Sequence, residues 1–273
     1  MTTTPGYVHG HAAAVRRSHA HRTAENSAAH LLPHLAPGLD LLDVGCGVGT
    51  LTADLAARTA PGRTVGVDAS ADVLTDAAAA ARERGVGVEL AVAEAGALPF
   101  ADGTFDVVHA HQVLQHLADP VGALREMARV CRPGGLLAVR DADYASVHAH
   151  PDLPGLRTWR EAYRRAARSA GGDPDAGAHL LALARAAGLA DAAEVAELVP
   201  SASVWLFATP AERAWWGGTW AERAEGEPLA GRLRAAGAGA EDLREVAAAW
   251  REWSAHPDGW MTMTHGELLV RLR

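Results

Sequence analysis

A glycine-rich segment at residues 43–50, with the sequence DVGCGVGT, holds the residues whose spacing best suits ligand binding. Its three glycines lack a β-carbon, so the backbone can come close to a bound molecule there. A helix that begins just after them would also offer free N–H groups. The dinucleotide fingerprint G-x-G-x-x-G would need glycine at position 50, where this chain has Thr50. Asp43, two residues before the first glycine, favours a ligand with a cationic amine over one with a pyrophosphate.

A second carboxylate, Asp68, ends the apolar segment 64–68. An acid at the tip of a second strand can accept hydrogen bonds from both hydroxyls of a ribose. Either motif alone also occurs in ordinary turns between strands and helices. Together, and in this order, they predict a site for a molecule that joins an amino acid to a nucleoside.

Alternating strands and helices between residues 39 and 144 must position these groups. Single helices between strands force parallel pairing, which gives a doubly wound α/β sheet. Ligands of such sheets bind beyond the carboxyl ends of the strands. Apolar runs and helical spacing predict strands at 39–44, 64–68, 86–92, 105–110 and 135–140, and helices at 50–58, 71–84 and 120–129. Further on, helices are predicted at 154–170 and 175–188, and strands at 194–207 and 260–264.

The composition describes a chain that can bury a large core. The 273 residues are 49% hydrophobic and 21% charged, which argues against intrinsic disorder. The formal net charge of −8 does not favour nucleic acid or an anionic membrane as a partner. Without a signal peptide or a long apolar run, we expect a cytoplasmic protein, a monomer or homodimer, with a small-molecule substrate. Two cysteines, Cys46 and Cys131, provide neither a disulfide framework nor a cysteine zinc site.

Four segments together resemble the class I S-adenosylmethionine-dependent methyltransferases. Within that family they are most similar to the branch of the ubiquinone/menaquinone-biosynthesis C-methyltransferases. The N-terminal residues also look like a related actinobacterial subgroup. The four segments are 42–49 (LDVGCGVG), 66–70 (GVDAS), 97–108 (ALPFADGTFDVV) and 132–135 (RPGG).

The resemblance implies a Rossmann-like sheet of seven strands, mostly parallel, with an antiparallel last strand. It also implies three parts of the chain. Residues 1–38 would form an N-terminal helical cap, and residues 39–208 with 258–273 the core that binds S-adenosyl-L-methionine. Residues 209–257 would form a helical insertion that covers the substrate as a lid.

The resemblance assigns cofactor roles to particular positions. The glycine turn would pass the methionine part, Tyr7 and Arg22 would close over its carboxylate, and the carbonyl of His111 would accept from its amine. Relatives usually carry aspartate where this chain has Glu94, and the longer side chain keeps the hydrogen-bond acceptor for adenine. The full set of expected cofactor residues is Tyr7, Arg22, Asp43, Gly45, Cys46, Gly47, Asp68, Ala69, Glu94, Ala95 and His111.

The segment 112–116, QVLQH, indicates a reaction that needs no metal. Similar O-methyltransferases of the ubiquinone pathway carry Glu-x-x-Glu-His here, an arrangement associated with a divalent metal. Amides such as Gln112 and Gln115 are poor substitutes for carboxylates on hard cations. An acceptor with an acidic proton would still need a base, and histidine suits that role best. Among 14 histidines, His11 and His116 are the catalytic candidates.

Eight tryptophans, against three phenylalanines and three tyrosines, gather mostly after residue 200. If Trp215 and Trp216 face the cleft, the acceptor is apolar or aromatic, such as a secondary metabolite, a quinone precursor or a polyketide. The other interpretation is that they fix the insertion to the sheet or form a dimer interface. Tyr144 is a further candidate for substrate contact.

The sequence thus predicts methyl transfer by an aligned displacement. Two alternatives stay open, since the cofactor pocket does not dictate the nucleophile. One is another reaction of the same cofactor, such as cyclisation or alkylation. The other is a binding module without catalysis.

Overall fold

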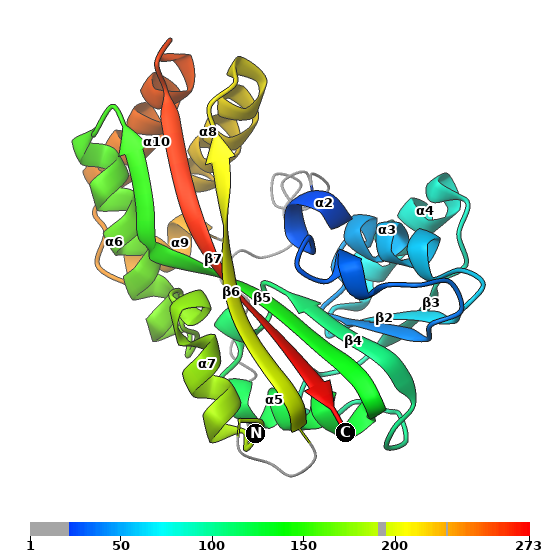
Figure 1. The fold of residues 1–273 in the computed structure, drawn as a ribbon. Coiled ribbons are helices and arrows are strands. Elements are labelled where there is room, and N and C mark those ends of the chain that lie inside the picture. Colours follow the sequence, from blue (N-terminus) through cyan, green and yellow to red (C-terminus); the bar gives the residue numbers. More distant parts are fainter. Residues whose placement is uncertain (1–21, 191–194, 228) are drawn as a thin grey trace.

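The computed structural model describes residues 22–190, 195–227 and 229–273, which surround one seven-stranded sheet (Figure 1). The strand order is β3-β2-β1-β4-β5-β7-β6, and β7 runs antiparallel to both of its neighbours. The predicted α/β sheet with an antiparallel last strand is therefore confirmed. The strands are β1 (Leu41–Val44), β2 (Thr64–Asp68), β3 (Glu89–Val92), β4 (Phe105–His111), β5 (Cys131–His150), β6 (Val195–Phe207) and β7 (Trp260–Leu272).

Helices cover both faces of the sheet because its central strands are apolar on both sides. In β5, Leu136 and Ala138 join the cluster under α2 and α3, whereas Leu137 and Val139 join the cluster under α5 and α7. The helices are α2 (Ala24–Ser27), α3 (Thr50–Thr59), α4 (Ala71–Arg84), α5 (Pro120–Val130), α6 (Pro154–Ser169), α7 (Ala176–Ala186), α8 (Pro210–Glu225), α9 (Leu229–Ala235) and α10 (Ala240–Ala255). Short 3₁₀ turns lie at Leu32–His34 and Leu114–His116.

The predicted insertion consists of α8, α9 and α10, which lie between β6 and β7 in the chain. Its interior is aromatic: the Trp159 ring packs edge-on against Trp220 and Trp250, with centroids 4.7 and 4.8 Å apart. Trp159 belongs to α6, so this helix packs with the insertion although it precedes β6. The boundaries 209–257 stay a prediction, and the structure adds α6 to the helices that would form the lid.

The fifth and seventh strands are longer than their apolar runs predicted. The sequence analysis ended the fifth strand at Arg140, but Arg140 and Asp141 both lie inside β5, are buried, and form hydrogen bonds with Glu267 of β7 and Gln115 of the 3₁₀ turn. β5 continues to His150 and β7 begins at Trp260, so the two strands extend together toward α6 and α10 (Figure 1). The extension carries the sheet beyond the ends of β1 and β4 and gives the helical insertion its base.

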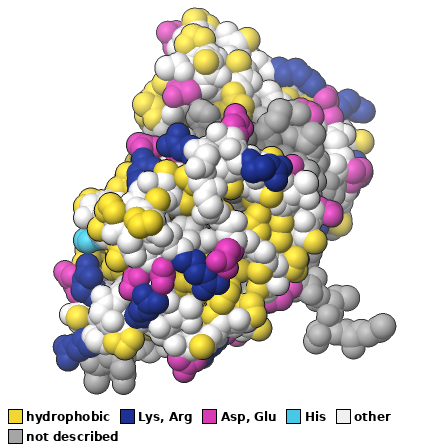
Figure 2. Space-filling model, turned by 90° about the vertical axis from the view of Figure 1, so that its right-hand side faces the viewer, with side chains coloured by type: hydrophobic (Ala, Val, Ile, Leu, Met, Phe, Trp, Pro, Cys, Tyr) yellow, Lys and Arg dark blue, Asp and Glu magenta, His cyan; other side chains and the backbone are white. Residues whose placement is uncertain are grey.

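Charged side chains of both signs are interspersed on the face shown in Figure 2. This face therefore presents no large area of one sign that would attract a polyanion. In the described part of the chain, no helix combines the length and the apolar character that a membrane crossing needs.

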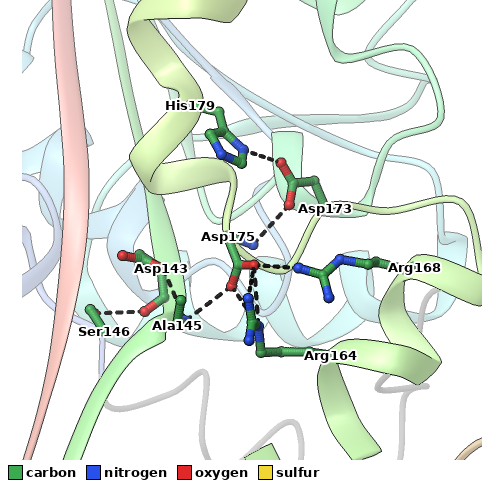
Figure 3. A network of polar contacts seen from close by, with 8 residues as sticks. All are labelled: Asp143, Ala145, Ser146, Arg164, Arg168, Asp173, Asp175 and His179. Atoms are coloured by element: carbon green, nitrogen blue, oxygen red, sulfur yellow. Dashed lines mark hydrogen bonds and ion pairs between the residues drawn. The ribbon is translucent and has the colours of Figure 1, made fainter. Parts of the chain in front are cut away.

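A polar network fixes α6 to β5 and α7 (Figure 3). Asp175, in the loop before α7, accepts hydrogen bonds from Arg164 and Arg168 of α6, each with a shortest distance of 2.6 Å. Its other oxygen accepts the backbone N–H of Ala145 in β5 at 3.0 Å. One buried carboxylate thus joins α6, β5 and α7.

We expect Asp175→Ala to lower the free energy of unfolding by about 1–3 kcal/mol, since it removes the charge-assisted hydrogen bonds that Arg164 and Arg168 donate to a buried carboxylate. The partly exposed arginine ends can find water, which limits the loss. Chemical denaturation measures the effect. The matched control is Asp152→Ala, which breaks the exposed pair with Arg157 and should cost less than about 0.5 kcal/mol. Equal losses in both variants would contradict this role of Asp175.

Candidate functional site

The glycine turn between β1 and α3 borders a crevice at the carboxyl ends of the strands. Gly45, Gly47 and Gly49 have φ angles of 70°, 54° and 75°, a region that glycine enters without steric cost. The N–H groups of Gly45 and Cys46 donate to the carbonyl of Val67 at 2.8 and 2.9 Å. These bonds hold the turn against β2 and leave its other side open to the crevice.

Packing within the protein excludes a side chain at two of these glycines. A β-carbon on Gly45 would collide with Val113, and one on Gly49 would lie 2.6 Å from Ala77. Arg22 and His111 complete the crevice wall. The residues present therefore suit the cofactor expected from the sequence, an extended molecule with an amino-acid end.

Asp68, the second predicted motif, is hydrogen-bonded to the glycine turn, the first. Its Oδ2 accepts the N–H of Gly47 at 3.0 Å, and its Oδ1 accepts the N–H of Ser70 at 2.9 Å. A carboxylate has about four acceptor positions, so each oxygen can take a further hydrogen bond. The structure thus brings Asp68 and the glycine turn together, as the sequence predicted.

The predicted adenine contacts lie at the next strand tip. β2 and β3 pair up to Asp68 and Val92, and the N–H of Ala93 donates to the Asp68 carbonyl at 3.0 Å. Ala69 and Glu94 follow these tips with exposed side chains, and Ala95 is buried. Glu94 and Ala95 follow β3, which lies on the side of β2 away from β1.

A buried pair at the base of the crevice escaped the sequence analysis. Asp43 Oδ1 lies 2.7 Å from His109 Nδ1, and Asp43 Oδ2 accepts from the Thr52 hydroxyl at 2.5 Å. Asp43 and His109 are register partners in β1 and β4, which is the signal that could have linked them. Because internal groups engage both oxygens, Asp43 supports the glycine turn through α3 and β4.

Gln112 follows β4 with an unusual φ of 55°, a strained conformation for a residue with a β-carbon. Its Oε1 accepts from Arg22 at 2.5 Å, and its Nε2 lies 2.9 Å from His265 Nε2. Arg22 is thereby held across the crevice, near the tip of β4. His111 is buried, and burial with the positive charges of Arg22 and Arg140 holds its pKa well below its usual range.

Of the two predicted catalytic histidines, His116 lies in the part of the chain that the structure describes. His11 lies outside the described residues, as does Tyr7. His116 ends the 3₁₀ turn after β4, and its Nε2 lies 3.1 Å from Gln115 Nε2. Burial, with the charges of Arg22 and Arg232, lowers the pKa of His116 to about 3. A ring with this pKa accepts hydrogen bonds at neutral pH but holds a proton poorly, which does not suit a general base.

Asp141, at the point where β5 passes the 3₁₀ turn, is a second residue that the sequence left unassigned. It is fully buried, and its Oδ1 accepts the N–H of Gln115 at 3.2 Å. Burial raises the pKa of Asp141 to about 7. The folded state therefore favours the protonated carboxyl, and stability is lost as the pH rises from about 4 through about 7.

We expect Asp141→Asn to remove this dependence, because an amide does not titrate. Relative to the original chain, the variant should gain stability at about pH 8 and show no gain at about pH 4. The melting temperatures of both proteins are measured at the two pH values. Subtracting one protein from the other at each pH removes the contributions of the other titrating groups. A gain of equal size at both values would show that Asp141 is not the titrating group.

A second cavity of about 280 Å³ lies between α2 and β6, beside the crevice. Trp215, which the sequence predicts as a substrate contact, lines it, and so do Trp205 and Arg140. Trp216 stacks on Phe207 at 4.4 Å and Tyr144 packs against Tyr163 at 4.3 Å. Both rings are buried in the aromatic cluster that α6, α8 and α10 form. Neither of them lines this cavity.

Comparison with known proteins defines the class of this chain. The family model described as a methyltransferase domain matches residues 42–139. An uncharacterized methyltransferase of Schizosaccharomyces pombe is 33% identical over 97% of this chain and 96% of its own length. The protein ltbC of Aspergillus luteorubrus, named as a methyltransferase, is 34% identical over 98% and 97%. The chain therefore belongs to the S-adenosylmethionine-dependent methyltransferases.

The other similarities are more local or more distant. A ubiquinone/menaquinone-biosynthesis C-methyltransferase of Bdellovibrio bacteriovorus is 37% identical over 37% of this chain and 43% of its own. Among solved structures, the [4+2]-cyclase SpnF is 25% identical, with a TM-score of 0.54 over 92% of this chain and 84% of that one. The predicted family resemblance is confirmed, whereas the actinobacterial subgroup stays a prediction.

Proposed function

We propose that this methyltransferase transfers a methyl group to a small, apolar or aromatic metabolite, without a metal, by an aligned displacement. The observation that carries the proposal is the position of the glycine turn. One side of the turn is hydrogen-bonded to β2, and the other side borders a crevice that Arg22 also lines. The adjoining cavity with its tryptophan wall supports an acceptor of apolar or aromatic character.

In this proposal the chain binds the cofactor at three places. Gly45, Cys46 and Gly47 take the methionine part, with Arg22 on its carboxylate and the His111 carbonyl on its amine. Asp68 takes the ribose hydroxyls, and its fixed hydrogen bonds to the turn set the distance between the two parts. The adenine lies at Ala69, Glu94 and Ala95. Tyr7 would complete the closure and lies outside the described residues.

When bound, the cofactor supplies a methyl group on a positively charged sulfur, and its transfer to the acceptor leaves S-adenosylhomocysteine. The chain has to align the acceptor with that methyl group and keep water away. The lid helices and the extended β5 and β7 supply an apolar cover for this purpose.

The residues after β4 support a reaction without a metal. The Gln112 and Gln115 amides replace the carboxylates of the metal-associated arrangement, and they are bonded to His265 and His116. His116 would accept a hydrogen bond and orient a neighbouring group, because its low pKa does not suit proton removal. His11 keeps its place as a candidate base.

The test is calorimetry with S-adenosylmethionine, followed by incubation of methyl-labelled cofactor with aromatic acceptors. We expect binding and the appearance of label on a second molecule. Failure to bind at about 1 mM cofactor would reject the proposal.

The likeness to SpnF keeps cyclisation as the second candidate, because the same cofactor site then serves a reaction without methyl transfer. In that case the acceptor changes its ring structure while the label stays on the cofactor. Binding without conversion of any acceptor would favour the third possibility, a module that binds the cofactor and has no catalytic activity.

A further inference from the structure

We propose that the cavity between α2 and β6 is the acceptor site, and that it takes a planar aromatic metabolite that carries an anionic oxygen, as in a carboxylate, phenolate or enolate. This inference rests on the proposed methyl transfer and adds to it the site, the chemical class of the acceptor and the residue that recognises it. That residue is Arg140.

The cavity adjoins the cofactor crevice. Arg22 lines both, and the ring of Trp205 in the cavity wall lies 5.8 Å from the ring of His111 in the crevice wall. An acceptor in the cavity would therefore lie next to the methionine end of the cofactor. The volume of about 280 Å³ suits a small bicyclic molecule better than a large one.

Arg140 provides the group in the cavity wall that would bind an anion. Its side chain is 1% exposed, and it lies on the strand next to Glu267 of β7. Its Nε and Nη2 donate to the Ser203 hydroxyl at 3.1 and 3.0 Å, and its Nη1 lies 3.5 Å from His111 Nδ1. A guanidinium has two N–H groups on each terminal nitrogen, so one on each finds no acceptor among the described residues. Two such N–H groups match a carboxylate or a pair of neighbouring oxygens.

The three described carboxylates of the cavity are each held by other hydrogen-bond donors, and none of them accepts a hydrogen bond from the Nη atoms of Arg140. Glu267 accepts from the hydroxyls of Ser201 and Ser203 at 2.8 and 2.5 Å and from Arg140. Glu212 accepts two backbone N–H groups at the start of α8. Glu25 pairs with Arg58 on the far side of α2. The remaining N–H groups of Arg140 are therefore the donors offered to an incoming oxygen.

Aromatic and apolar side chains form the rest of the wall. The Nε1 of Trp205 donates a hydrogen bond to the Asn26 carbonyl at 2.7 Å, which fixes the orientation of the ring. The guanidinium carbon of Arg140 lies 5.1 Å from the centre of that ring. Val204 and Leu206 line the cavity although 55% and 48% of their surface is exposed. Exposed apolar residues at a cavity mouth are typical of a site that receives an apolar ligand.

The low pKa values of nearby histidines also favour an acceptor that is already an anion when it binds. His111 lines the crevice and His265 lies 4.3 Å from Trp205 of the cavity wall, and burial lowers the pKa of both. They are poor bases at neutral pH. An anionic oxygen has no proton to lose before it attacks the methyl carbon, so methyl transfer forms the O–C bond, breaks the C–S bond and neutralises both charges.

The test measures binding of 2-naphthoate and of its uncharged analogue 2-naphthamide by quenching of tryptophan fluorescence. Saturating S-adenosylhomocysteine is present, so that the crevice is occupied. We expect 2-naphthoate to bind about tenfold more tightly than the amide, because charge-assisted hydrogen bonds discriminate between them. Equal affinities, or no binding of either probe, would overturn the inference. Absence of S-adenosylhomocysteine binding in calorimetry would instead reject the proposed function.

Two variants locate the probe. The double variant Arg140→Gln with Glu267→Gln removes both buried charges together and should abolish the preference for 2-naphthoate. Trp215→Ala should weaken both probes by about tenfold, since it opens the aromatic wall. The matched control Trp260→Ala removes an exposed tryptophan outside the cavity and should change neither affinity. A preference that survives the double variant, or equal effects of the two tryptophan variants, would place the probe elsewhere.

Discussion

The Gly47→Val variant is expected to lose detectable binding of S-adenosylmethionine, with a Kd above about 1 mM. Gly47 lines the crevice at a φ of 54°, where a β-branched residue is strained by about 1–2 kcal/mol. Its side chain would also occupy the space into which the cofactor has to fit. Calorimetry on the folded variant measures the loss, and circular dichroism shows whether the fold persists.

The control for backbone strain is Gly85→Val. Gly85 ends α4 with a φ of 73°, and nothing lies within 4 Å of a β-carbon placed there. This variant carries the same kind of strain away from the crevice and should bind the cofactor normally. If the two variants bind equally well, the glycine turn does not approach the cofactor.

The Asp68→Ala variant is expected to bind the cofactor about 5- to 150-fold more weakly, which corresponds to about 1–3 kcal/mol. Two contributions add up here. The ribose would lose its charged acceptor, and the N–H of Gly47 would lose the partner that fixes the turn. The same calorimetric titration measures the change.

Two further variants separate these contributions. Asp68→Asn keeps an oxygen for the Gly47 N–H but has only one acceptor atom, so its loss should be intermediate. Asp72→Ala removes an exposed carboxylate in the first turn of α4 and should leave the Kd unchanged. A normal Kd for a folded Asp68→Ala protein would mean that the ribose lies elsewhere.

The glycine turn and Asp68, which form the cofactor half of the proposed site, could be predicted to lie together because their determinants are local. The glycines of 43–50 need positive φ angles, and Asp68 stands at the end of an apolar strand, so both are visible in short segments. The helices and most strands followed from periodicity for the same reason. The pairing of Asp43 with His109 depends on strand register across 66 residues, which a single sequence does not reveal.

The proposed acceptor half depends on contacts between distant segments. The apolar run ends at Arg140, so the sequence alone does not show that Arg140 is buried beside Glu267, which lies 127 residues further on. Two neighbouring tryptophans differ in position: Trp216 joins the aromatic cluster of α6, α8 and α10, and Trp215 lines the cavity. Both lie on α8 and are adjacent in the sequence, so only the packing of the helix against β6 decides which of them faces the cavity.

Arg22 forms part of the wall of both cavities, and its bond to Gln112 fixes it between them. A ligand that draws its guanidinium toward one side changes the shape and charge of the other. Thermodynamic reciprocity then requires that each ligand alter the affinity for the other by the same factor. A single side chain would therefore make the two affinities interdependent, with no movement of the sheet beneath it.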